Sequence, residues 1–130
     1  MNATHFRSVP ELFLDRVKST PDRLAYQHPV GDGWERLTWK QTGERVRAIG
    51  CGLLSLGLEK GQRCAIVSST RLEWILADLG VLCAAGATST IYPSNTGDEC
   101  SYILGDSDSV VVFAEDETQV EKLVAERSKT

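Results

Sequence analysis

The stretch CAIVSSTRLEWILADLGVLCAAGATSTI, Cys64 to Ile91, alternates between strand and helix patterns. Four apolar residues at 64–67 predict a buried strand, a helical pattern runs from about 71 to 84, and a second strand is predicted at 87–91. Two neighbouring strands that are joined by a helix run parallel, with a right-handed crossover. The stretch therefore predicts a β-α-β unit of a layered α/β fold.

The residues downstream repeat this alternation. Thr96 and Glu99 have capping-box spacing, which predicts a helix over 97–105. The apolar run at 110–113 predicts a buried strand, and residues 106–108 are expected to form the loop before it rather than a cation site. A last helix is predicted from the apolar spacing of Val120, Leu123 and Val124.

Upstream, a helix and a hairpin are expected. Ser8 and Glu11 have capping-box spacing and predict a short amphipathic helix that ends before Pro21. A β-hairpin is then predicted from the alternation of Leu24, Tyr26 and His28, the turn Gly31-Asp32-Gly33 and a returning strand at 34–37.

A long helix follows the hairpin. Thr38 and Gln41 predict its capped start, and Gly57 can take the left-handed position at its end. Its apolar face is predicted from Val46, Ile49, Leu53 and Leu56. Gly50 and Gly52 lie inside this helical pattern rather than between a strand and a helix, so we expect them to allow close helix packing and reject a dinucleotide-binding loop.

The composition is that of one folded domain. The chain has 130 residues, of which 42% are hydrophobic and 25% charged, and it contains no repeat or linker. We expect a single unit over 1–130, in which 1–60 is a lead-in of helix, hairpin and helix, and 61–130 is an alternating β/α unit. The expected class is α/β, with a layered parallel sheet.

Charge and hydropathy narrow the range of partners. The net charge is −4 and the pI is about 5.2, so no basic surface for nucleic acid is expected. The longest apolar run, 74–87, contains Asp78 and is shorter than the roughly 20 residues that span a bilayer. We therefore expect a cytoplasmic chain.

The cysteines do not predict a metal site. Cys51, Cys64, Cys83 and Cys100 are far apart, form no CxxC pair and have no histidine at ligand spacing. Each lies within or beside an apolar pattern, so we interpret them as reduced thiols of the core. A single reactive thiol remains an alternative.

Polar side chains follow two strands of the predicted parallel sheet. Ligands of open α/β sheets bind at the carboxyl ends of the strands, which makes this edge the candidate site. Its candidate residues are Ser68, Ser69 and Thr70 after the first strand and Tyr92, Ser94, Asn95 and Thr96 after the second.

Each of these residues also has a structural interpretation. For Ser69, Thr70 and Thr96, we favour helix capping over ligand contact by about three to one. Tyr92-Pro93 fits a rigid exit turn and a pocket wall equally well. We expect Trp74 to pack rather than to bind. The chain contains no phosphate-binding loop, nucleophile elbow or metalloprotease motif, and thus no complete catalytic constellation.

The order and spacing of the short motifs over 57–116 resemble the N-terminal region of AMP-forming acyl-CoA synthetases of the long-chain fatty acid type. The similar pieces are GLEKGQRCAIV, SSTRLEW, GATSTIYP and YILGDS, and the upstream LTWKQTGERVRAIGCGLLSLG is similar as well. Gln62 departs from the family's usual acidic residue, and Ser94 stands where long-chain members often have threonine.

The resemblance implies a part in a larger N-terminal domain with a flavodoxin-like layer. Such enzymes activate a fatty acid with ATP and Mg²⁺ to an acyl-adenylate and transfer the acyl group to CoA. The segment equivalent to Tyr92, Pro93 and Ser94 lies beside the channel where CoA and the acyl group meet, and Ser69 and Thr70 are expected at the pocket edge. The family's phosphate loop, adenine contacts, magnesium-binding acid and C-terminal lysine all correspond to positions beyond 130, so we expect this chain alone to bind no cofactor and to be inactive.

Two other classes stay open. One is a stand-alone α/β binding or regulatory module without catalysis, although the strand ends lack the acidic cluster of a phospho-receiver. The other is an interaction piece, because exposed apolar surface would favour dimerisation. A lipid substrate would also be compatible with peripheral membrane association of the longer enzyme, although no basic amphipathic helix is apparent.

Overall fold

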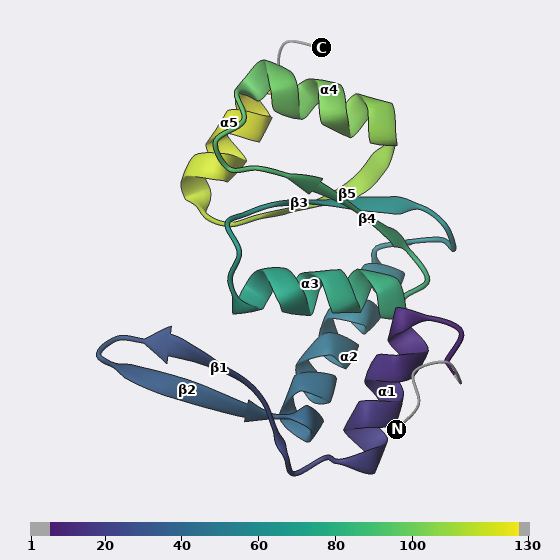
Figure 1. Ribbon diagram of the computed structural model, residues 1–130. Coiled ribbons are helices and arrows are strands. Elements are labelled where there is room, and N and C mark those ends of the chain that lie inside the picture. Colours follow the sequence, from purple (N-terminus) through teal and green to yellow (C-terminus); the bar gives the residue numbers. More distant parts are fainter. Residues whose placement is uncertain (1–5, 128–130) are drawn as a thin grey trace.

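The computed structural model describes residues 6–127, which form five helices and five strands (Figure 1). In chain order these are α1 (Val9–Ser19), β1 (Leu24–Val30), β2 (Gly33–Thr38), α2 (Trp39–Ser55), β3 (Arg63–Val67), α3 (Leu72–Cys83), β4 (Ala87–Ile91), α4 (Gly97–Ser107), β5 (Ser109–Ala114) and α5 (Glu117–Arg127). The order of helices and strands matches the prediction along the whole described chain.

The second half of the chain is built on a parallel sheet of three strands in the order β4-β3-β5. The central strand β3 pairs with both neighbours, so that Val67 lies opposite Ile91 on β4 and Ala114 on β5. All three strands therefore end at the same edge. The layered α/β class with a parallel sheet is confirmed.

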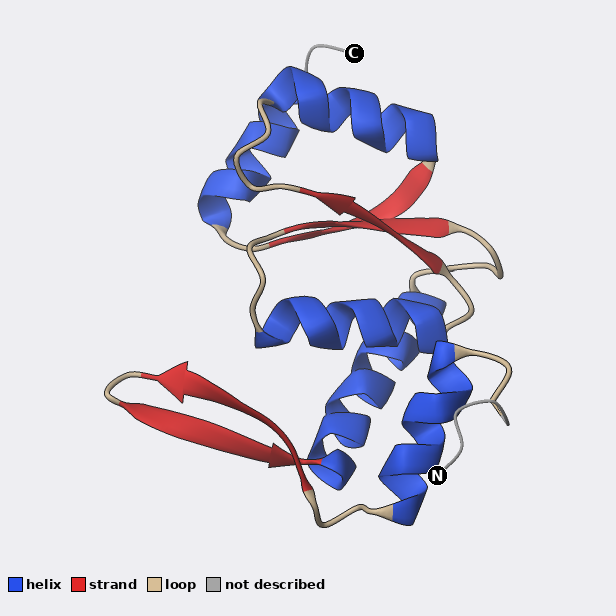
Figure 2. Ribbon diagram, viewed as in Figure 1, coloured by secondary structure: helices blue, strands red, loops and turns tan. Residues whose placement is uncertain are grey.

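Helices cover both faces of this sheet (Figure 2). Side chains of β3 alternate between the faces. Cys64 packs with Val81 and Ala84 on the α3 side, and Ala65 and Val67 pack toward α4 and α5. Every side chain from Cys64 to Val67 is at most 1% exposed. Full burial of an Ile or Val side chain contributes about 1.5–3 kcal/mol, which makes β3 the centre of the fold.

The lead-in packs against the other side of α3. Phe13 of α1, Leu37 of β2 and Val46 of α2 form one buried cluster with leucines of α3. Trp39 lies between two aromatic neighbours, with ring centroids 6.2 Å from Phe13 and 5.9 Å from Tyr26. The far end of the hairpin extends away from the helices (Figure 1).

The predicted capping box of α2 is confirmed in both directions. The Thr38 hydroxyl accepts from the Gln41 amide at 3.2 Å, and the Gln41 side chain accepts from the Thr38 amide at 2.9 Å. Gly57 takes the predicted left-handed conformation, with φ 97°.

The other two boxes form only in part. Ser8 and Thr96 accept from Glu11 and Glu99 as predicted. The returning carboxylates go elsewhere, because Glu11 accepts from the amide of Arg7 and Glu99 accepts from the side chain of Asn95.

Three predictions about these elements need correction. Gly33 pairs with Val30 inside the hairpin, so the turn has two residues, Gly31 and Asp32. Helix α4 continues to Ser107, so the loop expected at 106–108 shrinks to Asp108, which ends the helix with φ 52°. The strand predicted at 110–113 forms as part of β5, but its predicted burial is wrong, since β5 is an edge strand whose residues are mostly half-buried and Val110 is 52% exposed.

Two expectations for α2 are also wrong in part. Gly50 is buried, and a Cβ there would lie 3.5 Å from the carbonyl of Gly80, as close packing requires. Gly52 has nothing within 4 Å of that position and faces outward, because it lies on the opposite side of the helix. Cys51 is exposed for the same reason, whereas Cys64 and Cys100 are buried as expected and Cys83 is half-buried.

Candidate functional site

The candidate site is the edge at which β3, β4 and β5 all end. Ser68 follows β3, Tyr92 follows β4 and Glu115 follows β5. The sequence identified the first two strand ends. It did not identify Glu115, whose importance depends on β5 being the neighbour of β3.

Ser69, Arg71 and Glu115 form a hydrogen-bonded cluster between β3 and β5. The Glu115 carboxylate accepts from the Ser69 hydroxyl, from the Ser69 amide at 3.4 Å and from Arg71 Nη1 at 3.4 Å. Arg71 also donates from Nε to Glu73 at 2.8 Å. The bond from Ser69 is the main cause that lowers the pKa of Glu115, with Arg71 adding to it. Glu115 is thus held as an anion.

The structure corrects the role assigned to Ser69 and Thr70. Neither caps α3, because the N-cap position belongs to Arg71, which makes no side-chain capping bond. Both line a cavity of about 300 Å³ between the start of α3 and the hairpin, together with His28 and Pro29. Their place at the edge of a ligand pocket stays a prediction, which the position of this cavity supports.

A second cavity lies directly beneath the cluster. It has a volume of about 230 Å³, and Ser68, Arg71, Glu73 and Glu115 supply its polar wall. The apolar wall consists of Ile66, Trp74, Ala77, Phe113 and Ala114. Trp74, expected to pack, is half-buried and does line this cavity.

The hairpin side of the edge is also charged. Glu35 Oε1 lies 2.8 Å from His28 Nε2 and 3.3 Å from Arg45 Nη2. The hydrogen bond to His28 is the largest cause of a lowered pKa at Glu35. Charged and polar groups thus flank the edge on both sides.

Tyr92, Pro93, Ser94 and Asn95 form a tight turn after β4. The Asn95 side chain accepts from the Tyr92 amide at 2.9 Å, and the Asn95 amide donates to the Tyr92 carbonyl at 3.0 Å. Asn95 also donates to Glu99 at 2.5 Å, the main cause that lowers the pKa of Glu99. The turn leaves Tyr92 77% exposed, and Ser94 is exposed too.

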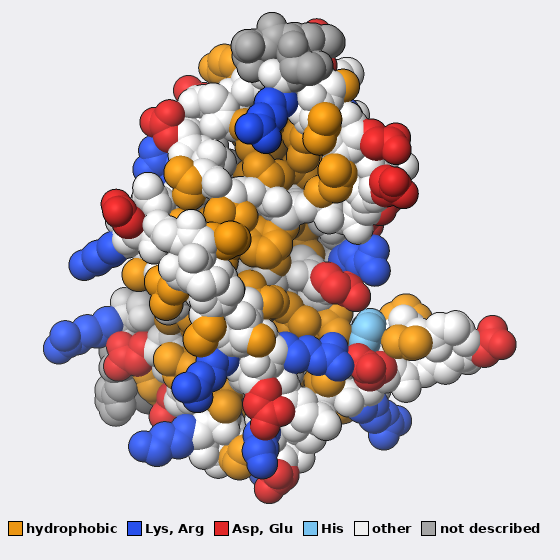
Figure 3. Space-filling view, turned by 180° about the vertical axis from the view of Figure 1, so that it is seen from behind, with side chains coloured by type: hydrophobic (Ala, Val, Ile, Leu, Met, Phe, Trp, Pro, Cys, Tyr) orange, Lys and Arg blue, Asp and Glu red, His pale blue; other side chains and the backbone are white. Residues whose placement is uncertain are grey.

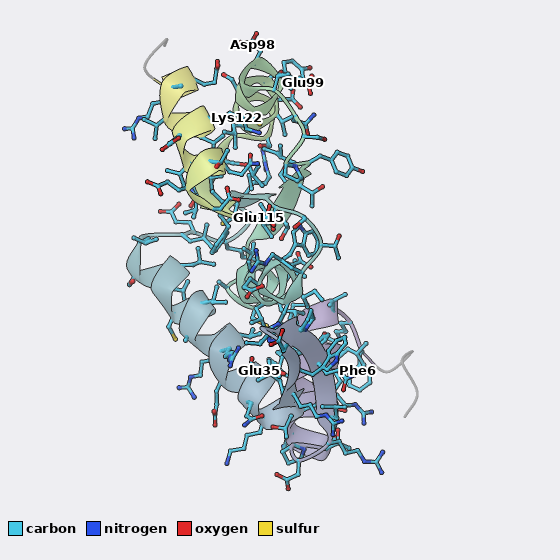
Figure 4. All side chains as sticks on the ribbon, turned by 90° about the vertical axis from the view of Figure 1, so that its left-hand side faces the viewer. Phe6, Glu35, Asp98, Glu99, Glu115 and Lys122 are labelled. Atoms are coloured by element: carbon cyan, nitrogen blue, oxygen red, sulfur yellow. The ribbon has the colours of Figure 1, made fainter. Side chains whose placement is uncertain are left out.

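Two side chains of helix α5 hold this turn, and Figure 4 labels one of them, Lys122. Lys122 Nζ donates to the carbonyls of Pro93 at 3.1 Å and Asn95 at 2.6 Å. Gln119 Nε2 donates to the same Pro93 carbonyl at 3.2 Å. No local pattern indicates these two residues, because they come from a helix that begins more than 20 positions later in the chain.

The predicted site residues thus fall into two groups. Ser69 belongs to the cluster at β3 and β5, with Thr70 beside it, and the turn from Tyr92 to Ser94 lies over α5. Within residues 6–127 no hydrogen bond joins the two groups. Both groups lie at the predicted edge of the sheet, but they are separate from each other.

The described residues do not provide a metal centre. Over 6–127 no group of three or more His, Cys, Asp or Glu side chains could hold a metal ion. We therefore derive no step through a magnesium ion at this edge. None of the helices described is long and apolar enough to cross a membrane.

Comparison with known proteins identifies the family. The family model described as AMP-binding enzyme matches residues 13–130. The chain belongs to this family. The resemblance to AMP-forming acyl-CoA synthetases that the motifs indicated is confirmed.

Curated relatives agree with this assignment. The chain is 32% identical over 121 residues to the long-chain-fatty-acid–CoA ligase FadD15 of Mycobacterium bovis, which covers 93% of the chain and 20% of that protein. It is 28% identical over 117 residues to the long-chain-fatty-acid–CoA ligase ACSBG2 of Xenopus laevis, covering 90% of the chain and 16% of that protein. The chain thus spans about a fifth or less of these relatives.

Solved structures share the fold. The N-terminal domain of FACL13 from Mycobacterium tuberculosis matches with a TM-score of 0.85 at 24% identity, covering 95% of this chain and 30% of that one. A fatty acyl-adenylate ligase from Legionella pneumophila, solved with acyl adenylate and pyrophosphate, matches with a TM-score of 0.80 at 23% identity, covering 92% and 21%. The fold is that of the N-terminal domain of adenylate-forming enzymes.

Proposed function

We propose that this chain is the N-terminal portion of an ATP-dependent long-chain fatty acid–CoA ligase. The observation that carries the proposal is the match to a long-chain ligase across 93% of the chain, together with a fold shared with the N-terminal domain of FACL13. The parent enzyme would activate a fatty acid with ATP to an acyl-adenylate, with release of pyrophosphate, and would then transfer the acyl group to the CoA thiol. Fatty acid, ATP, CoA and Mg²⁺ are its proposed ligands.

In this proposal the chain contributes scaffold and one wall of the site. Tyr92 and Ser94 project from a turn whose backbone is fixed, and they would line the region where CoA meets the acyl group. The cluster of Ser69, Arg71 and Glu115 would hold the ends of β3 and β5 in register. Charge stabilisation of the phosphoryl groups would come from residues outside this chain, because Lys122, which contacts the turn, is engaged by two carbonyls.

The test is a pair of assays on the longer protein that carries this chain. Fatty acid-dependent exchange of pyrophosphate into ATP reports the first half-reaction, and formation of acyl-CoA reports the second. We expect both with long-chain fatty acids. If neither acyl-adenylate nor thioester forms from any fatty acid, the proposed function is wrong.

The 130-residue chain by itself is the matched control. We expect it to give no pyrophosphate exchange, because its described residues form no phosphate-binding loop or metal cluster. Turnover by the isolated chain would mean that catalytic groups lie within it. We also propose that the longer protein is cytoplasmic and associates with membranes peripherally. Separating cells that contain it into soluble and membrane fractions, and assaying each fraction, tests both proposals.

A further inference from the structure

Three hydrogen bonds from α5 converge on the backbone of the 92–95 turn. Lys122 donates two of them and Gln119 donates one. Both acceptor residues, Pro93 and Asn95, offer carbonyl oxygens, so α5 fixes the path of the backbone and leaves Tyr92 and Ser94 exposed. This differs from a packing contact, which would cover the side chains themselves.

The turn depends on these donors. Two bonds join Tyr92 and Asn95 within the turn, and Asn95 is also bonded to Glu99 and to the Cys100 thiol of α4. None of these bonds reaches Pro93. Because Pro93 has no amide hydrogen, its carbonyl is the only backbone hydrogen-bonding group through which this residue can be held. Gln119 and Lys122 both bind that carbonyl.

The burial of Gln119 is informative. Its side chain is 9% exposed, and its Oε1 atom has no hydrogen-bond partner among the residues described. A buried oxygen without a partner costs stability. The unpartnered Oε1 of Gln119 therefore lowers the stability of the core, whereas its Nε2 holds the turn. An apolar side chain of similar size would pack at this position without that cost.

Helix α5 also lies close to the start of α4, on the other side of the turn. A Cβ added to Gly97, the first residue of α4, would come within 2.9 Å of the Glu126 carboxyl carbon. The turn and the first residue of the next helix are thus both placed against one helix. A shift of α5 would move both together.

We propose that Gln119 and Lys122 are positioning residues, which set the place of Tyr92, Pro93 and Ser94 at the sheet edge through the carbonyls of Pro93 and Asn95. This inference rests on the proposed function for its role in the reaction. The contact between α5 and the turn stands independently of it. Neither residue touches a substrate in this scheme, since each acts through the turn.

The first test is hydrogen exchange at the turn. Lys122→Met keeps the aliphatic stem and removes both donated bonds, and Lys18→Met makes the same change on α1 as a control. In Lys122→Met we expect the amides of Tyr92 and Asn95 to exchange about tenfold faster, the factor that a charge-assisted hydrogen bond is worth, with β3 unaffected. Equal exchange in the two variants would overturn the inference.

Gln119→Met separates positioning from stability. It removes the Pro93 contact together with the unpartnered oxygen, so we expect faster exchange at the turn without a lower unfolding midpoint. Lys122→Arg keeps a cationic donor and should restore most of the protection. If the amides of the turn exchange as slowly in Gln119→Met as in wild type, the part assigned to Gln119 is wrong.

The second test is kinetic and uses the longer enzyme. In Lys122→Met we expect KM for CoA to rise by about tenfold to a hundredfold, the effect of misplacing a binding wall, with pyrophosphate exchange near wild type. Unchanged KM in an active enzyme whose turn exchanges faster would overturn the positioning role. A wild-type enzyme that forms no acyl-adenylate would instead refute the proposed function, and the exchange data would still decide whether α5 holds the turn.

Discussion

At the residue scale, Glu115 connects two strand ends of the site through one carboxylate. It accepts from Ser69 and Arg71, and these bonds lower its pKa below the ordinary value of 4.5. A carboxyl with a lowered pKa in the folded state stabilises the fold above its unfolded pKa. That stabilisation is lost as the pH falls through the lower, folded value.

The free energy of unfolding should therefore depend less on pH in Glu115→Gln than in wild type. We expect the variant to be less stable than wild type at pH 6, and the difference to shrink as the pH falls below the ordinary carboxyl pKa of 4.5. Urea unfolding from pH 6 to pH 3 measures this. Glu121→Gln, an exposed carboxylate on α5, is the control. Parallel pH curves for wild type and Glu115→Gln would contradict the assignment.

At the scale of elements, the contact of α2 with α3 depends on two small residues. Gly50 faces the carbonyl of Gly80, and a Cβ on Gly80 would come within 2.9 Å of Ile49 Cβ, closer than carbon atoms approach. This close approach brings the lead-in against the α3 layer that supports the sheet. The packing at Gly80 therefore determines how the two halves of the chain meet.

Gly80→Ala should lower the free energy of unfolding by about 1–3 kcal/mol, because the added methyl overpacks the contact with Ile49. Gly52→Ala lies on the open face of α2 and should raise it by up to about 1 kcal/mol through helix propensity. Urea unfolding of the two variants measures both values. A Gly80→Ala protein as stable as Gly52→Ala would show that the helices can separate without cost.

The limits of sequence-based prediction follow from separation along the chain. Thr38 and Gln41 are three residues apart, and their capping box was predictable because both partners lie in one local pattern. Ser69 and Glu115 are 46 residues apart, and Pro93 and Lys122 are 29 apart. These contacts depend on the strand order β4-β3-β5, which no local pattern specifies. The edge could thus be predicted, but not the residues that hold it.

At the scale of the whole molecule, β4 and β5 are both edge strands of the described sheet, and apolar side chains lie beside the open edge of β5. β5 pairs with β3 on one side only, and Val110 on β5 and Val120 and Val124 on α5 are 45–58% exposed. A groove of about 390 Å³ runs between α4, β5 and α5, with Leu104, Val112 and Leu123 in its wall. Figure 3 shows hydrophobic side chains gathered over the middle of one face.

This open edge is the basis of the last prediction, self-association of the 130-residue chain. An unpaired strand edge with apolar neighbours is a template for pairing with a second copy. We expect the mass measured by light scattering to rise with concentration. Val110→Lys should lower that association, because a lysine on an edge strand opposes pairing. Leu14→Lys changes a side chain on α1 that is equally exposed, at 55%, and should leave the association unchanged. A monomer at every concentration, or equal loss in both variants, would mean that the β5 edge does not mediate contact between copies.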